Sequence, residues 1–266
     1  MDSVPSKNKP LQLSKVAQVT VIFWLLKIIS TTIGESSSDF MYSISPVLSI
    51  GAIFLLLITS LFIQITHKRF VSWMYWSVII LVAIFGTMFA DAIHFIGVPL
   101  IVSTGCFVFL LMSIFYIWYR NEKTLDPHCI NTTKREIFYW LVILFTFCLG
   151  TSSGDFVAHS LHLGYVQATI FFGLAMIFIP SILYVFRIDN ITLFWITYIL
   201  TRPFGASAAD LIAKPKSLGG FGLGDGTTSL IFLGVMFVFV FVFVLILNFS
   251  SKEHKSVDEI LNIEEL

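Results

Sequence analysis

The chain has 266 residues, 57% of them hydrophobic and 12% charged, and its mean hydropathy of +0.90 excludes an ordinary soluble globular domain. The 16 Lys and Arg residues balance the 16 Asp and Glu residues, so net charge indicates neither a nucleic-acid partner nor an acidic substrate. The cysteines exclude a disulfide framework or a zinc site, because Cys106, Cys129 and Cys148 are odd in number and scattered. The composition predicts a membrane protein, with the lipid bilayer as a partner.

Eight apolar segments are long enough to cross a bilayer, which takes about 20 residues as a helix. Twelve of the 16 Lys and Arg residues lie before the first segment or after an even-numbered one. The positive-inside rule therefore places these linkers and both termini in the cytoplasm, and the first segment is predicted to be retained because it has no clear cleavage site. The predicted spans are 17–40, 45–66, 72–93, 98–119, 137–158, 164–186, 191–213 and 228–248.

A tandem repeat runs through the odd-numbered spans. In each, an aromatic residue and Trp are followed by fourteen residues and then Asp, with a glycine five residues before that Asp. The four copies are FWLLKIISTTIGESSSD, YWSVIILVAIFGTMFAD, YWLVILFTFCLGTSSGD and FWITYILTRPFGASAAD. They predict an all-α integral membrane protein of eight transmembrane helices, arranged as four parallel tandem helical hairpins. The aromatic pairs are expected to form a belt at the membrane surface.

The repeat also divides the chain into units. Four two-helix repeats are separated at their middle by a longer basic linker, and polar segments stand at the two ends. The predicted units are a cytoplasmic N-terminal segment (1–16), repeats at 17–70, 71–119, 137–187 and 188–249, a cytoplasmic linker (120–136) and a cytoplasmic tail (250–266).

Intramembrane charge distinguishes odd from even spans. The even spans contain no Asp, Glu, Lys or Arg. Because charges inside a membrane normally face the protein interior or water, we expect the odd helices inside and the even helices facing lipid. The odd spans hold Lys27, Glu35, Asp39, Asp91, Asp155, Arg202 and Asp210.

The repeated glycines are predicted to loosen or break the odd helices, so that each following Asp lines a cavity. Such a break would explain carboxylates near helix C-termini, where the helix dipole disfavours each by roughly 0.3–1 kcal/mol. The alternative is that the glycines and the small residues beside them form a tight packing seam. The helix-break glycines are Gly34, Gly86, Gly150 and Gly205.

The repeated aspartates are expected to line an ion or substrate path. Residues three or four apart share a helix face, and in three copies that neighbour of Asp is Glu or His. Carboxylates suit Mg²⁺, Ca²⁺ and Mn²⁺, while imidazole favours Mn²⁺, Fe²⁺ or Zn²⁺; the histidines could equally be interfacial residues. The path residues are Asp39, Asp91, Asp155, Asp210 and Glu35, and the candidate metal ligands are Glu35, Asp39, Asp155, His159, Asp91 and His94.

Two basic residues are expected to balance this acidic charge. Arg202 is predicted to face an acidic partner such as Asp39 or Asp155, and Lys27 to do the same. The spans hold five acidic and two basic residues, so they favour a cation over an anion. The stretch SLGGFGLGDG after Lys216 lacks the GK[ST] ending of a phosphate loop and is expected to be a flexible outer loop.

The motifs resemble those of a bacterial family of uncharacterised multi-pass membrane proteins defined by a tandem repeat of unknown function. The resemblance covers residues 18–250 and rests on the repeated motif, on LHLGY after Asp155 and on ILTRPFGASAADLIAKP in the last copy. Commoner members read closer to TTxGExxGD in the first copy, where this chain has Ser38 in place of the last glycine, whereas Gly154 keeps it in the third copy. Membership implies the bacterial inner membrane and no established reaction. The Glu-x-x-x-Asp element is similar, more loosely, to acidic motifs of cation/proton exchangers.

These features favour a secondary transporter or exporter of a cation, with a divalent metal such as Mn²⁺ as candidate cargo and no resident cofactor. Proton coupling would follow if a buried carboxylate exchanges a proton. The alternative is a non-transporting membrane scaffold or assembly protein whose Gly, Ser and Asp motifs only pack helices. An enzyme is not expected, because the sequence has no H-E-x-x-H, no G-x-S-x-G and no serine with an evident base.

Overall fold

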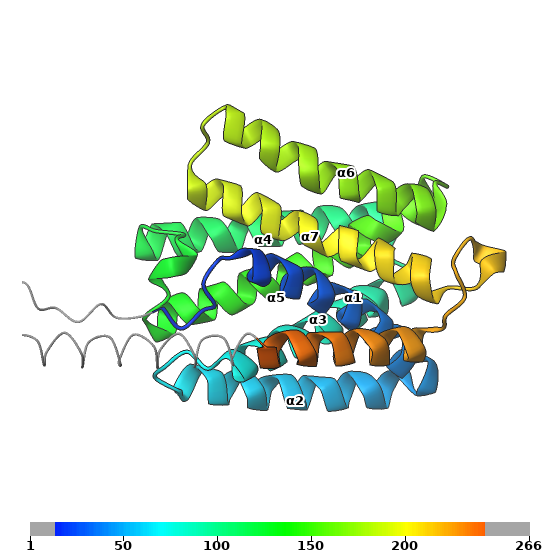
Figure 1. The fold of residues 1–266 in the computed structure, drawn as a ribbon, viewed down its shortest axis with the longest axis horizontal. Helices are drawn as coiled ribbons and strands as arrows, with labels where there is room; N and C mark the ends of the chain where they lie inside the picture. The colour runs from blue at the N-terminus through cyan, green and yellow to red at the C-terminus, as the bar shows by residue number, and fades with distance from the viewer. Residues whose placement is uncertain (1–13, 243–266) are drawn as a thin grey trace, which may run out of the picture.

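The computed structural model describes residues 14–242, and this part of the chain is helical and contains no strand. The helices lie roughly along one direction and form a single bundle (Figure 1). The predicted tail (250–266), most of the N-terminal segment (1–16) and the end of the last predicted span lie outside the described residues. The long helices are α1 (Val21–Ile44), α2 (Pro46–Thr66), α3 (Ser72–Phe95), α4 (Leu100–Glu122), α5 (Thr133–Asp155), α6 (Gly164–Val185), α7 (Asn190–Ala213) and an eighth over Asp225–Val242.

Local sequence explains where several of these helices begin. Thr20 caps α1 by accepting a hydrogen bond from the backbone N–H of Phe23 at 3.2 Å, and Thr132 caps α5 in the same way. Asp189 caps α7 through the N–H of Thr192 at 2.9 Å. Only Ser45 separates α1 from α2, because Pro46 cannot continue the first helix but suits the first turn of the second.

Six of the long helices in the described chain are long and apolar enough to cross a membrane, which indicates a multi-pass protein in a lipid bilayer. The other two long helices, α1 and α7, are 24 residues each. They carry Lys27, Glu35 and Arg202, and these charges and their polar neighbours lower the hydropathy of the two helices. Neighbouring helices of the bundle cover these polar side chains of α1 and α7.

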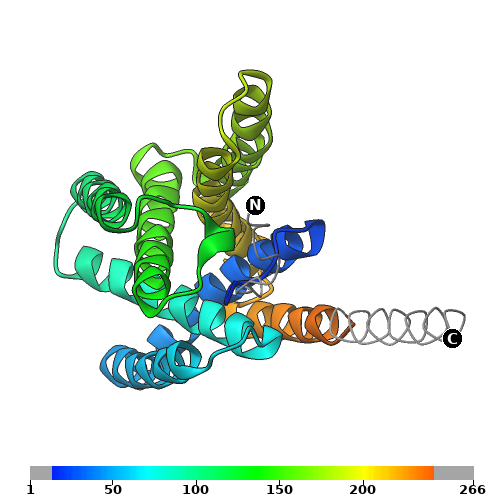
Figure 2. The same cartoon turned by 90° about the vertical axis from the view of Figure 1, so that its left-hand side faces the viewer.

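The odd-numbered helices form a closed ring. Helix α1 packs on α3, α3 on α5, α5 on α7, and α7 returns to pack on α1. Helices α2, α4 and α6 lie outside this ring, where Figure 2 shows them at the periphery of the bundle. Twelve residues of α1 are buried but only four of α2, so the inner and outer helices differ sharply in exposure.

Each outer helix packs mainly against the inner helix that follows it in the chain. Contacts of α2 with α3, of α4 with α5 and of α6 with α7 are more extensive than those within the predicted hairpins. The helix Asp225–Val242 extends the pattern to α1, since the hydroxyls of Ser229 and Ser37 lie 2.5 Å apart. The packed pairs therefore cross the boundaries of the sequence repeats.

The helix breaks expected at the repeated glycines are absent, because α1, α3, α5 and α7 each run through their glycine without interruption. Each glycine instead lies against the next helix of the ring, where an added Cβ would collide with it. The prediction was wrong because a missing side chain here serves close packing rather than bending. The four contacts pair Gly34 with Ala83, Gly86 with Phe147, Gly150 with Arg202, and Gly205 with Thr31.

The glycine-rich stretch after α7 also differs from the flexible loop that was expected. It folds back and donates backbone hydrogen bonds to carbonyls at the end of α7, including Phe221 N–H to Leu211 at 2.7 Å and Gly222 N–H to Lys214 at 2.8 Å. Gly222 and Gly224 have φ of 82° and 84°, which favour glycine. The stretch therefore caps the C-terminus of α7 and fixes Lys214.

Candidate functional site

The inner helices run in the same direction, so the bundle has two distinct ends. The repeated aspartates lie at one, called here the aspartate end. The aromatic pairs lie toward the other, called the linker end because the linker 120–136 is there. The pairs do not form a surface belt, since Phe23, Tyr75 and Tyr139 are 2%, 0% and 0% exposed and belong to the apolar core.

Arg202 forms the polar centre of the ring. Its side chain is fully buried, and its guanidinium donates to the carboxylate of Glu35 and to the hydroxyl of Thr151, each at 2.8 Å. It also donates to the hydroxyl of Thr87 and, at 3.3 Å, to the backbone carbonyl of Thr31. Arg202 therefore has a buried acidic partner, but this partner is Glu35 and not Asp39 or Asp155, which were the residues suggested by the sequence.

The side chains around Arg202 share one position in the repeat. Glu35, Thr87 and Thr151 each directly follow the repeated glycine, in the first, second and third copies. Both threonine hydroxyls also lie 3.4 Å from the Glu35 carboxylate. Sequence reasoning missed Thr87 and Thr151, although their shared register with Glu35 was a signal that could have identified them. All four repeats thus supply one part of this cluster.

The prediction for Lys27 was wrong, because among the described residues no acidic side chain lies within hydrogen-bond distance of it. Its side chain is fully buried, and its Nζ atom lies 4.1 Å from the ring centres of Phe147 and Tyr198. No hydrogen-bond partner for Nζ is found among the described residues. Glu35, two turns further along α1, is already engaged by Arg202. The aromatic faces are the favourable contacts that remain for Lys27.

Three carboxylates converge at the aspartate end of the ring. One oxygen each from Glu35, Asp39 and Asp210 lies within 4.8 Å of the others, a separation that would allow them to hold one cation. Glu35 and Asp210 are buried, whereas Asp39 is half-buried. This cluster joins the first repeat to the last across the contact between α1 and α7.

Lys214 bridges the carboxylates at this end of the ring. Its ammonium lies 2.5 Å from Asp39, 3.2 Å from Asp225 and 3.8 Å from Asp210. Burial alone would lower the pKa of Lys214, but the carboxylates of Asp39 and Asp210 outweigh burial and raise that pKa above the usual lysine value. The lysine is therefore held as a cation among three carboxylates.

An open pocket of about 460 Å³ lies beside this ammonium. Asp91 reaches the pocket from the second repeat, so it shares the site with Asp39. His94 also lines it, but its ring is exposed and its Nδ1 lies 3.2 Å from the carbonyl of Val98 in the following turn. The other lining residues are Tyr42, Ser43, Phe95, Lys214 and Asp225.

Asp155 lies close enough to Glu35 and Asp39 for their charges to interact, but it does not belong to the three-carboxylate cluster. His159 is exposed, and its ring lies edge-on to Tyr165 at 5.6 Å between centres. The structure thus brings the four repeated aspartates, Asp39, Asp91, Asp155 and Asp210, to one end of the ring. Of the six candidate metal ligands, Glu35 and Asp39 share the cluster with Asp210, while Asp91, His94, Asp155 and His159 lie outside it.

The repeat seen in this geometry is also a recognised family feature. A family model described as Repeat of Unknown Function (DUF347) matches residues 74–124, 138–189 and 193–246. The chain belongs to this family. The three matches begin at the aromatic pairs of α3, α5 and α7 and each extends over the next outer helix.

The part of the chain before residue 74 lies outside the DUF347 matches, yet α1 carries the same aromatic pair, glycine and aspartate and closes the ring. It also provides Glu35 and Asp39, so the first copy contributes the carboxylates nearest to Arg202 and Lys214. No curated protein and no solved structure matches the chain.

Proposed function

We propose that the protein is a secondary transporter or exporter of a cation in the bacterial inner membrane. The proposed topology has eight spans as four parallel repeats, both termini in the cytoplasm, the odd helices inside and the even helices facing lipid. The contrast in burial between the ring and the outer helices supports this arrangement, because lipid is the natural partner of α2, α4 and α6.

The convergence of carboxylates at the aspartate end is the observation that carries the proposal. Membrane interiors disfavour ionised side chains, and such residues commonly mark ion pathways. Here Glu35, Asp39 and Asp210 lie within 4.8 Å of one another beside an open pocket that Asp91 also lines. Within the predicted odd-numbered spans, five carboxylates stand against Lys27 and Arg202, which leaves an excess of three negative charges in favour of a cation.

The proposed cargo is a divalent metal ion such as Mn²⁺. The three clustered ligands are all carboxylates, which are the ligands that hard divalent cations prefer. Within the described residues no thiol belongs to the cluster, so soft metals are less suited to it. Asp39 and Asp210 would bind the ion, Asp91 and Asp155 would line its path, and Glu35 would complete the ligand set or carry a proton.

Two cations would offset part of the acidic charge of the site before an ion enters. Arg202 neutralises Glu35 from inside the ring, and Lys214 occupies the space among Asp39, Asp210 and Asp225 from outside. An arriving ion would displace the ammonium of Lys214, which then turns into the open pocket. Entry would therefore exchange one cation for another and leave no carboxylate unpaired.

A second candidate function is a non-transporting membrane scaffold or assembly protein. The observation that favours it is the packing role of the motif, since every repeated glycine lies at a helix contact and the hydroxyl of Ser37 meets that of Ser229. In this case the carboxylates would only join α1 to α7 through Lys214 and Arg202.

Elemental mass spectrometry distinguishes the transporter from the scaffold by measuring total cellular Mn, Fe, Zn, Mg and Ca. Cells would express either the wild type or the Asp39→Asn/Asp210→Asn variant at matched membrane levels. The transporter predicts that the content of one metal changes with the wild type alone. Equal contents of all five metals in both strains would contradict a divalent cargo and favour the scaffold.

A further inference from the structure

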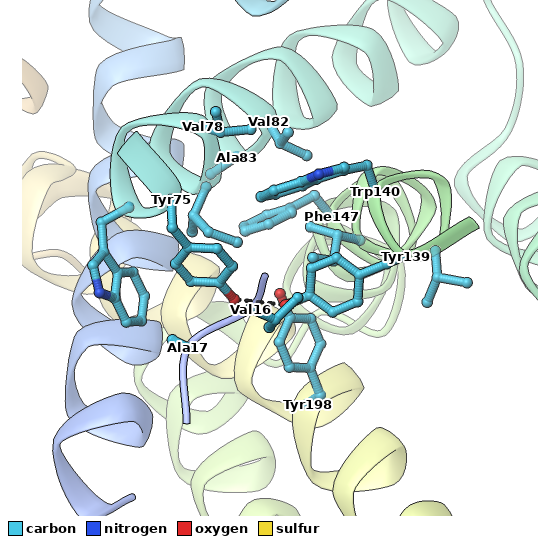
Figure 3. Close-up of a cluster of buried hydrophobic side chains, with 14 of the residues drawn as sticks. Val16, Ala17, Tyr75, Val78, Val82, Ala83, Tyr139, Trp140, Phe147 and Tyr198 are labelled. Carbon is cyan, nitrogen blue, oxygen red and sulfur yellow. Dashed lines mark hydrogen bonds between the residues drawn. The ribbon is translucent and has the colours of Figure 1, made fainter. Parts of the chain in front are cut away.

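A short segment before α1 covers the linker end of the ring. Residues 14–20, called here the N-terminal strap, run across this end before Thr20 caps α1. Val16 and Ala17 are 5% and 8% exposed and belong to the main apolar core. Figure 3 shows them in one cluster with Tyr75 and Tyr139. The strap is thus packed into the bundle rather than laid on its surface.

A layer of tyrosines lies where the strap enters. Tyr75 and Tyr139 are the first aromatic residues of the second and third repeats, and their hydroxyls lie 2.6 Å apart. With Tyr198 of the last repeat they are fully buried, and Figure 3 draws all three with Val16. Without the strap, the three tyrosine side chains would be exposed and would line an opening at the linker end of the helix ring.

A buried ion pair fastens the strap. The ammonium of Lys15 lies 2.5 Å from the carboxylate of Glu136 at the start of α5, and it donates to the carbonyl of Ile65 at 2.9 Å. The amide of Gln64 donates to the other oxygen of Glu136 at 3.3 Å, and the backbone N–H of Lys15 donates to Ile130 at 2.8 Å. Glu136 is 1% exposed, so Lys15 is the cation that neutralises it among the described residues.

A buried ion pair is a weak choice for permanent closure. Two charges lose their hydration when they pair inside a protein, and well-packed apolar side chains would hold the segment at least as firmly. A charged pair differs from an apolar contact when the strap moves away, because the ammonium and the carboxylate are then hydrated again and part of the cost of separating them is recovered. One partner, Lys15, lies on a short segment outside the ring helices, and the other, Glu136, lies in the first turn of α5, at the opposite end of that helix from Asp155. This position suits a contact that forms and breaks.

We propose that the N-terminal strap is a gate that closes the linker end of the ring, with the Lys15–Glu136 pair as its latch. The two ends of the bundle are then in opposite states, since an open pocket adjoins the carboxylates at the aspartate end. Alternating access requires the reverse arrangement as well, in which the linker end opens. This role in access rests on the proposed function, whereas reversible closure by the strap does not.

The test is the rate at which a maleimide reagent modifies Ala17→Cys in the full-length protein. The background carries Cys106→Ser and Cys129→Ser, and the buried Cys148 stays as an internal reporter of unfolding. The latch predicts slow labelling with the pair intact and labelling faster by roughly tenfold or more in Lys15→Met or Glu136→Gln, because the local opening becomes easier. Lys134→Met is the matched control, since Lys134 is exposed on the first turn of the same helix as Glu136.

The charge-swapped variant Lys15→Glu/Glu136→Lys decides the matter if the single variants are poorly folded. The latch predicts that it regains slow labelling of Ala17→Cys. Equal labelling rates in the wild-type, single-variant and control backgrounds would overturn the proposal. So would labelling of Cys148 in step with Ala17→Cys, because the pair would then support the whole bundle. Labelling needs no transport, so a working latch without any cation flux would refute the proposed function alone.

Discussion

The guanidinium of Arg202 on α7 lies 2.8 Å from the carboxylate of Glu35 on α1, and this pair joins the last repeat to the first at the centre of the ring. Both side chains are buried, and the hydroxyls of Thr87 and Thr151 complete the contacts. Each of the four repeats therefore contributes one polar group to a single cluster, although only one of these groups is a cation.

Breaking this pair from one side should be costly. Arg202→Met leaves the charge of Glu35 buried without a partner, and we expect a loss of about 3–5 kcal/mol in the free energy of unfolding. The double variant Arg202→Met/Glu35→Leu removes both charges and should lose much less than the sum of the two single variants. Chemical unfolding of the purified protein in detergent measures all three, and additive losses would contradict a paired site.

The repeated glycines should resist even the smallest side chain. In Gly34→Ala and Gly86→Ala, the new Cβ would lie 2.5 Å from the Cβ of Ala83 and 2.7 Å from that of Phe147. Overpacking of this kind costs about 1–3 kcal/mol, which exceeds or cancels the gain in helix propensity of up to about 1 kcal/mol.

Gly51→Ala and Gly105→Ala are matched controls on the outer helices, where nothing lies within 4 Å of an added Cβ. These variants should keep or raise the melting temperature in detergent, while the two ring variants lower it. Similar melting temperatures for all four would show that the inner helices are not packed through their glycines.

Lys214 should compete with any cation that binds the cluster. Removing its ammonium in Lys214→Ala leaves Asp39, Asp210 and Asp225 without their shared cation. A unit charge at about 4 Å is worth roughly 4 kcal/mol near a protein surface, so Mn²⁺ should bind the variant at least about tenfold more tightly.

The rise in melting temperature with Mn²⁺ concentration gives this affinity, because a ligand stabilises the state that it binds. Lys216→Ala is the control, since it removes an equal charge from an exposed neighbour. If Mn²⁺ stabilised the Lys214→Ala protein no more than the Lys216→Ala protein, Lys214 would not occupy the cation position.

Repetition made much of the architecture predictable. The fixed register of aromatic pair, glycine and aspartate indicated an inner set of helices, and the charge-free segments indicated an outer set. The odd helices do form the ring, with α2, α4 and α6 outside it. The DUF347 matches confirm the family, while the eight-span topology and its orientation stay predictions.

Contacts across the ring were less predictable, because a repeat defines positions and leaves the choice of neighbours to packing. Arg202 pairs with Glu35 because α7 adjoins α1 in a closed ring. The number and order of the predicted hairpins do not reveal this contact. The glycines gave the right positions but the wrong role, since a missing side chain can serve bending or close approach equally well. Lys214 lay outside the predicted span, so its bridge to Asp39 was not foreseen.

Cation flux through the purified protein is the most direct test of the central claim. The protein would be reconstituted into liposomes, and uptake of Mn²⁺, Mg²⁺ and Ca²⁺ would be followed for the wild type, Asp39→Asn and the control Asp126→Asn, which alters a carboxylate in the linker. The account predicts that the wild type and the control carry at least one of these ions, whereas Asp39→Asn is folded but inactive. Folded wild-type protein that carries none of them faster than empty liposomes would contradict divalent-cation transport.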